Sequence, residues 1–134
     1  MSKVGIIEFD KLVIGDYLMK SNDHLREWSC PLPKLTHGNY MFYNCDNLTS
    51  FSGDLSSLQY AERMFSQCID FTTFECSNLN SLKEAPDMFS ACDITSFNYD
   101  LPNLTNADSM FSHSYELKSF SGSVNKLQVA DSMF

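Results

Sequence analysis

The chain has 134 residues, with 17 acidic and 9 basic side chains, so its net charge is −8. The length is that of one domain, and the charge argues against nucleic acid and anionic membranes as partners. No run approaches the roughly 18 apolar residues of a membrane span, and the short apolar run near the amino terminus does not predict a signal peptide.

The amino-terminal segment is a degenerate copy of a 23-residue repeat. Three pairs of equivalent residues define the match: Phe9 and Leu32, Leu12 and Leu35, and Gly15 and Gly38. This first copy carries more charge than the later ones, as expected of a terminal repeat whose outer face meets water. We expect residues 1–24 to form an N-terminal capping repeat and residues 25–134 to form five tandem repeats, the last one incomplete.

From residue 25 onward an apolar pattern recurs every 23 residues or so. In the copy that begins at Leu48 it reads LxxFxxxLxxLxxAxxMFxxC. This spacing fits neither an amphipathic helix nor a hairpin strand, and repetition at this length is typical of a solenoid. The copy after it gains a residue between Phe74 and Leu79 and loses one before Ile94. The copies are marked by the pairs Met41-Phe42, Met64-Phe65, Met88-Phe89, Met110-Phe111 and Met133-Phe134.

The segment from Leu48 to Gly53 and its equivalents are predicted to be short strands of a parallel sheet, in about six coils spaced about 4.8 Å apart. The segment from Leu58 to Phe65 would cover the other side as 3₁₀ turns or a second irregular strand. The inward aromatic column comprises Trp28, Phe51, Phe74, Phe97 and Phe120. The outward positions are Glu27, Ser29, Ser50, Ser52, Thr73, Glu75, Ser96, Asn98, Ser119 and Ser121.

The cysteines fit a core role better than a bridge or a metal site. Cys45, Cys68 and Cys92 share one column, about 5 Å apart and within disulfide range, but inward side chains there suit small buried hydrophobes. Cys30 and Cys76 lie two coils apart, about 10 Å, which is too far to bridge. The spacing of the five cysteines along the chain matches no zinc-binding pattern. We expect five reduced core thiols.

The ionisable residues predict no catalytic site. His24, His37 and His113 occupy three different repeat positions, so no two should meet at a nucleophile. Some aspartates recur at the same repeat position and form partial acidic columns. Stacked carboxylates suit calcium, but these columns are interrupted, and aspartates in turns usually accept hydrogen bonds from nearby backbone amides. We therefore predict no catalytic residue, no cofactor and no metal ligand, and calcium binding stays open. The partial acidic columns are Asp23, Asp46 and Asp93, and Asp54 and Asp100.

The run Cys-x-x-Leu-Thr-Ser-Phe followed by Leu-x-x-Ala-x-x-Met-Phe-x-x-Cys resembles the BspA-type leucine-rich repeats and the related Met-Phe-x-x-Cys repeats of bacterial surface proteins. Similar arrays occur in bacteriophage and protozoan proteins. The resemblance covers residues 9–134 and implies a leucine-rich-repeat solenoid. The chain departs from the family pattern in three ways. Ser114 replaces Cys in one copy, the usual Pro after the strand is mostly absent, and no secretory signal is present.

Two functions are compatible with this resemblance. The first is a non-enzymatic scaffold for protein–protein interaction, with the outward strand positions as the binding face. The second is a structural component of a larger assembly, such as a bacteriophage virion, that contacts its neighbours through its ends. Without a signal or membrane segment, a cytoplasmic or virion-associated location is expected, and a cell-surface one only if the chain is a fragment.

The carboxyl-terminal coil is a further candidate contact. Solenoid ends need a cap, because the last coil otherwise exposes its core and its strand edge. We expect this coil to be covered by another protein chain or by further sequence. The candidate end-docking residues are Phe111, Phe120, Leu127, Met133 and Phe134.

Overall fold

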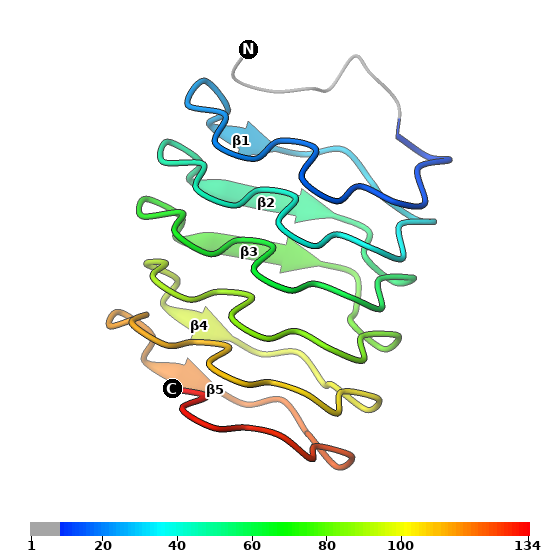
Figure 1. Cartoon of the computed structure of the whole chain (residues 1–134), viewed down its shortest axis with the longest axis vertical. Coiled ribbons are helices and arrows are strands. Elements are labelled where there is room, and N and C mark those ends of the chain that lie inside the picture. The colour runs from blue at the N-terminus through cyan, green and yellow to red at the C-terminus, as the bar shows by residue number, and fades with distance from the viewer. Residues whose placement is uncertain (1–8) are drawn as a thin grey trace.

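The computed structural model describes residues 9–134, so the first eight residues of the predicted capping repeat lie outside the described part. The chain winds into coils that stack in sequence order along the long axis (Figure 1). No helix occurs between residues 9 and 134. The strands are β1 (Glu27–Trp28), β2 (Ser50–Gly53), β3 (Thr73–Cys76), β4 (Ser96–Phe97) and β5 (Ser119–Phe120), each from one coil.

The strands pair in parallel and in the register of the repeat. Trp28 lies opposite Phe51, and Phe51 lies opposite Phe74. Phe97 lies opposite Phe120 in the same way. The prediction of short parallel strands is therefore confirmed, with the aromatic residue of each strand directed inward.

The strands do not form one continuous sheet, which corrects the prediction. β1, β2 and β3 make one sheet and β4 and β5 make another, with no pairing between β3 and β4. The residue lost before Ile94 shortens the lead into β4. Before β3, the amide of Thr72 donates to the carbonyl of Thr49 in the preceding coil (3.0 Å). Before β4, the bond to the preceding coil instead runs from the amide of Asp93 to the carbonyl of Phe71 (3.0 Å). The sequence slip therefore has a visible effect on the backbone.

The opposite side of each coil is held by a second, shorter ladder. It consists of single-residue parallel bridges with no 3₁₀ turn in the described residues, so of the two predicted forms the structure has the irregular strand. We call this ladder the bridge column. Its members are Ile14, His37, Tyr60, Glu84, Asn106 and Val129.

The Met-Phe segment is a run of tight turns. Its amides alternate between local and inter-coil acceptors: Met41 donates to Gly38 (3.1 Å), and the next residue, Phe42, donates to Met64 of the following coil (2.9 Å). Tyr40 and Asn44 adopt left-handed backbone angles (φ 59° and 58°), which are uncommon for residues other than glycine. A strand would send consecutive side chains to opposite faces. These turns instead bury both Met41 and Phe42.

Two aromatic stacks run through the core. One contains the Phe of each Met-Phe pair, and its rings Phe42 and Phe65 are 5.2 Å apart and nearly parallel. The other is the predicted strand column, where Phe51 and Phe74 are 5.7 Å apart. Rings of the two stacks meet edge to face, as Phe51 and Phe65 do at 75°, which is a favoured arrangement. The strand column is buried as predicted, except that Phe120 is only half-buried.

The repeated cysteine supplies a small hydrogen-bond donor. The thiols of Cys45, Cys68 and Cys92 donate to the carbonyls of Met19 (3.0 Å), Phe42 (3.0 Å) and Phe65 (2.7 Å) of the preceding coil. In the next coil, the hydroxyl of Ser114 makes the same bond to Phe89. Serine therefore replaces cysteine without loss of the donor.

All five cysteines are reduced, as predicted. The expectation that all five lie in the core needs one correction, because Cys76 is only half-buried. Cys76 is the last residue of β3, the strand that has no pairing with β4.

Replacing Phe65 with Ala should lower the free energy of unfolding by about 3–5 kcal/mol. Its ring is fully buried and stacks on Phe42, Phe71 and Phe89. The control is Ser52→Ala, at an exposed position of β2, which should change it by less than about 0.5 kcal/mol. Urea titration measures both. Similar losses in the two variants would contradict the placement of Phe65 in the core.

A thiol reagent at about pH 8 should label the native chain slowly, because the thiolate is the reactive form. Burial raises the pKa of Cys45 to about 11 and that of Cys76 to about 12, and it raises the pKa of Cys68 and Cys92 as well. Mass spectrometry after denaturation without reductant should find all five cysteines labelled. A smaller number would reveal a disulfide.

Candidate functional site

The ten predicted outward positions all lie on the strand side of the coils. Nine are exposed, and Ser50 is half-buried. Their side chains are small and polar or acidic, without an aromatic or Arg residue among them. The face is smooth along β1, β2 and β3, but it is interrupted before β4 by the split between the sheets.

A hollow of about 340 Å³ marks this interruption. Tyr99 fills part of the missing pairing, because its hydroxyl accepts from the amide of Cys76 (3.2 Å) and lies 3.3 Å from the carbonyl of Phe74, to which it donates. Partial burial raises the pKa of Tyr99, so the hydroxyl keeps its proton for this role. The hollow is lined by Thr72, Thr73, Phe74, Glu75, Thr95, Ser96, Asn98 and Tyr99.

Of the five candidate end-docking residues, only Phe134 is broadly exposed, at 68%. It stacks on Phe111 at 5.7 Å and thereby covers it. Met133 is buried as well, and Phe120 and Leu127 are half-buried. The exposed apolar surface at this end of the stack is therefore smaller than the sequence alone indicates, with Phe134 as the most exposed of the five residues.

In the second acidic column, the carboxylates of Asp54 and Asp100 accept hydrogen bonds from serines of their own or the following coil. Asp54 accepts from the amide of Ser56 (2.9 Å) and from the hydroxyl of Ser77 (3.0 Å), and hydrogen bonds from Ser56 and then Ser77 lower its pKa. Asp100 accepts from the amide and the hydroxyl of Ser123. Within residues 9–134, no three His, Cys, Asp or Glu side chains are grouped to hold a metal ion.

A cluster of tyrosines was not predicted from the sequence. It lies on the side of the coils formed by the tight turns of the Met-Phe segments, which we call the turn side. Tyr17 and Tyr40 occupy the same repeat position, and their rings stack at 5.0 Å. Tyr43 lies against Tyr40 at 5.3 Å. Arg63 lies 5.8 Å over the Tyr40 ring and donates to its hydroxyl at 3.2 Å, and Lys20 lies 5.6 Å from the Tyr17 ring. We call these five residues the tyrosine cluster.

The position of the cluster follows from the turns. Tyr17, Tyr40 and Arg63 are 23 residues apart and all have left-handed backbone angles, so their side chains leave the turn in the same outward direction. The 23-residue spacing of two tyrosines and an arginine was the available signal.

Two hollows flank the tyrosine cluster on the turn side. The larger, of about 500 Å³, forms where the repeat position of Tyr43 is filled by small residues in the following coils. Below it, the hydroxyls of Ser66 and Ser90 are bonded at 2.7 Å. Its lining is Tyr43, Arg63, Ser66, Gln67, Asp87, Ser90, Ala91, Ser112 and His113.

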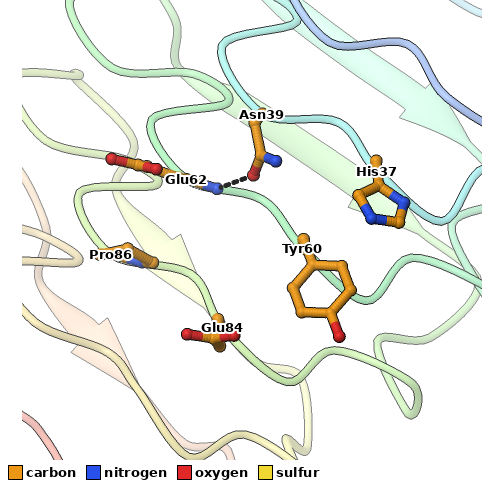
Figure 2. Close-up of a pocket in the computed structure, with 6 residues that line it drawn as sticks. All are labelled: His37, Asn39, Tyr60, Glu62, Glu84 and Pro86. Carbon is orange, nitrogen blue, oxygen red and sulfur yellow. Dashed lines mark hydrogen bonds between the residues drawn. The ribbon is translucent and has the colours of Figure 1, made fainter.

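The second hollow, of about 300 Å³, lies on the bridge column, and we call it the bridge hollow. Figure 2 shows its six side chains, with His37 and Tyr60 on one side of the view and Glu62 and Pro86 on the other. The His37 and Tyr60 rings are 4.8 Å apart, and Asn39 accepts from the amide of Glu62 at 2.8 Å. The lining is His37, Asn39, Tyr60, Glu62, Glu84 and Pro86.

The three histidines do not form a reactive group with one another. His37 lies in the bridge hollow, where Nδ1 is 2.8 Å from the hydroxyl of Thr36. His113 bonds Ser112 at 2.9 Å and lies beside Tyr115. The amide of His24 donates to Asn22. The ring bonds of His37 and His113 each go to the hydroxyl of the residue that precedes the histidine.

A comparison with family models gives a match over residues 6–118 to the BspA type Leucine rich repeat region, in six copies. The chain belongs to the BspA-type leucine-rich-repeat family. The resemblance noted in the sequence is therefore confirmed, and the matched family indicates a repeat scaffold and not a catalytic fold. No curated protein and no solved structure matches this leucine-rich-repeat chain. Within residues 9–134, no helix has the length and apolar character needed to cross a membrane.

Proposed function

We propose that this leucine-rich-repeat chain is a non-enzymatic scaffold that binds a protein partner, with the tyrosine cluster as the main contact. The observation that carries the proposal is the stacked arrangement of Tyr17, Tyr40 and Arg63 on the surface of three successive coils. Tyr and Arg are enriched among the residues that contribute most to binding energy at protein interfaces.

The cluster is held in place before any partner binds. Arg63 is fixed by its bond to Tyr40 and by an ion pair with Asp87 at 3.6 Å. The turns beneath it are bonded to the next coil, as in the bond from Tyr40 to Glu62 at 2.8 Å. Side chains that are already ordered lose little conformational entropy on binding, which favours affinity.

The predicted strand face serves as a second, weaker contact in this proposal. Its polar side chains are accessible, but it lacks the large anchors found at binding hot spots. It extends the interface without setting its affinity.

The double variant Tyr40→Ala/Tyr43→Ala tests the main contact. We expect it to weaken capture of the partner from the native source by tenfold or more, which corresponds to about 1.4 kcal/mol or more. The measurement is quantitative mass spectrometry of proteins retained at several bait concentrations. The matched control is Tyr115→Ala, which removes a tyrosine that is 81% exposed and outside the cluster.

The control should retain the same partner with unchanged affinity. Retention of that partner by the double variant, with loss in Ser52→Arg on the strand face, would move the binding site to the strands. Equal retention by all three variants would contradict both surfaces.

A second candidate is a structural part of a larger assembly, for example a virion, with contact through a coil face. It is favoured by the coil that contains β5, where Phe134 is exposed. In the preceding coil Ala107, Ser109 and Phe111 donate to the next coil, but the equivalent amides make no backbone bond within residues 9–134. These equivalents are Ala130, Ser132 and Phe134.

Sedimentation velocity tests this second candidate. If another copy covers this face, the chain should self-associate with rising concentration, and Phe134→Asp should weaken the association because it puts a charge on the apolar face. Phe134→Leu is the control and should associate as the unmodified chain does. A monomer at all concentrations would contradict contact between copies.

A further inference from the structure

We propose that the bridge hollow binds a lysine or arginine side chain of the partner protein, with the cation between the ring of Tyr60 and the carboxylates of Glu62 and Glu84. This inference rests on the proposed protein-binding function and gives the chemical class of the partner segment, a basic one. It concerns a different set of residues from the tyrosine cluster.

Charge is the first argument. The two outward columns that pass through the hollow contain five carboxylates and no Lys or Arg. Lys83 and Arg63 are the nearest basic residues in sequence, and the single ion pair within residues 9–134 is that of Arg63 with Asp87. Glu62 and Glu84 are exposed and form no ion pair within residues 9–134, although the charge of Glu62 also acts on the neighbouring Arg63. The columns are Ile14, His37, Tyr60, Glu84, Asn106 and Val129, and Asp16, Asn39, Glu62, Pro86, Asp108 and Asp131.

The aromatic side of the hollow is the second argument. Tyr60 is half-buried and held by His37 at 4.8 Å. A cation over such a ring is attracted by its negative face. Pro86 supplies an apolar surface on the opposite side (Figure 2), against which the methylene groups of a long basic side chain can pack while its charge stays near water.

The composition of the hollow favours an organic cation over a metal ion. Within residues 9–134, no three acidic, His or Cys side chains are placed to coordinate one metal. The lining instead combines two carboxylates with two aromatic rings and a proline. That mixture complements a charged group on an apolar stem.

The surface on the amino-terminal side of the bridge hollow is apolar and favours an apolar residue in the partner segment that carries the basic side chain. Ile14 is 61% exposed and Val13 is 47% exposed. Ile14 lies two coils before Tyr60 in the bridge column, a distance of about 10 Å, which an extended chain covers in about three residues. The partner segment should therefore carry an apolar residue about three positions from its basic one.

The test uses a fluorescein-labelled octalysine peptide, with octaglutamate as the peptide control, in fluorescence anisotropy at low salt. The variant Glu62→Gln/Glu84→Gln should weaken octalysine binding by about tenfold. The matched control Asp70→Asn/Glu116→Gln also removes two negative charges, at exposed positions outside the hollow. It should weaken octalysine binding by less than about twofold.

Tyr60→Leu should weaken binding by about threefold, because it keeps an apolar side chain but removes the ring face. Urea titration of each variant establishes that it is folded. Equal weakening by both double variants would show attraction to the net charge alone and would overturn the inference, as would absence of octalysine binding to the unmodified chain.

The result is separable from the proposed function. If Tyr40→Ala/Tyr43→Ala loses the captured partner but Glu62→Gln/Glu84→Gln keeps it at full affinity, the inference fails and the protein-binding function stands. If octalysine binds in the hollow but neither double variant affects any captured protein, the proposed function fails by itself.

Discussion

The structure depends on hydrogen bonds between the backbones of successive coils. On the strand side these bonds run both ways: the amide of Thr49 donates to Arg26 of the preceding coil, and the amide of Leu32 donates to Asp54 of the following coil. On the turn side an earlier coil donates to the later one, as Phe42 does to Met64. Each coil therefore satisfies backbone groups of both neighbours, and buried backbone groups must be satisfied in this way.

This arrangement fixes what the side chains can be. Because adjacent coils are held at the spacing of paired strands, equivalent side chains are stacked directly on one another. Flat rings tolerate that spacing well, as the stack from Phe42 to Phe65 and Phe89 does. The thiol of Cys68 and the hydroxyl of Ser114 tolerate it because both are small and donate to the preceding coil.

The inward half of the structure could be predicted from the sequence, because inward positions repeat. The strand register, the column of Phe51 and the reduced state of Cys45 and Cys68 all follow from a regular step between coils. The split between β3 and β4 could not, because the effect of one lost residue depends on how Tyr99 occupies the gap.

The candidate site was harder to predict because outward positions do not repeat. The tyrosine cluster requires Tyr17 and Tyr40 in one column, Arg63 below them and Tyr43 beside them. That neighbourhood depends on the left-handed turns, whose direction is not written in the apolar pattern. The hollows depend further on the sizes of unlike side chains in adjacent columns.

The split between the two sheets has a consequence for how two neighbouring coils are joined. At the same junction the turn side remains fully joined, for example by the bonds from Phe89 to Met110 and from Ala91 to Ser112, both 2.9 Å. On the strand side the same two coils are joined through side chains, by the hydroxyl of Tyr99 and by the stacked rings of Phe74 and Phe97 at 6.2 Å. At this one junction the strand side therefore depends on the identity of a side chain, whereas a main-chain ladder would not.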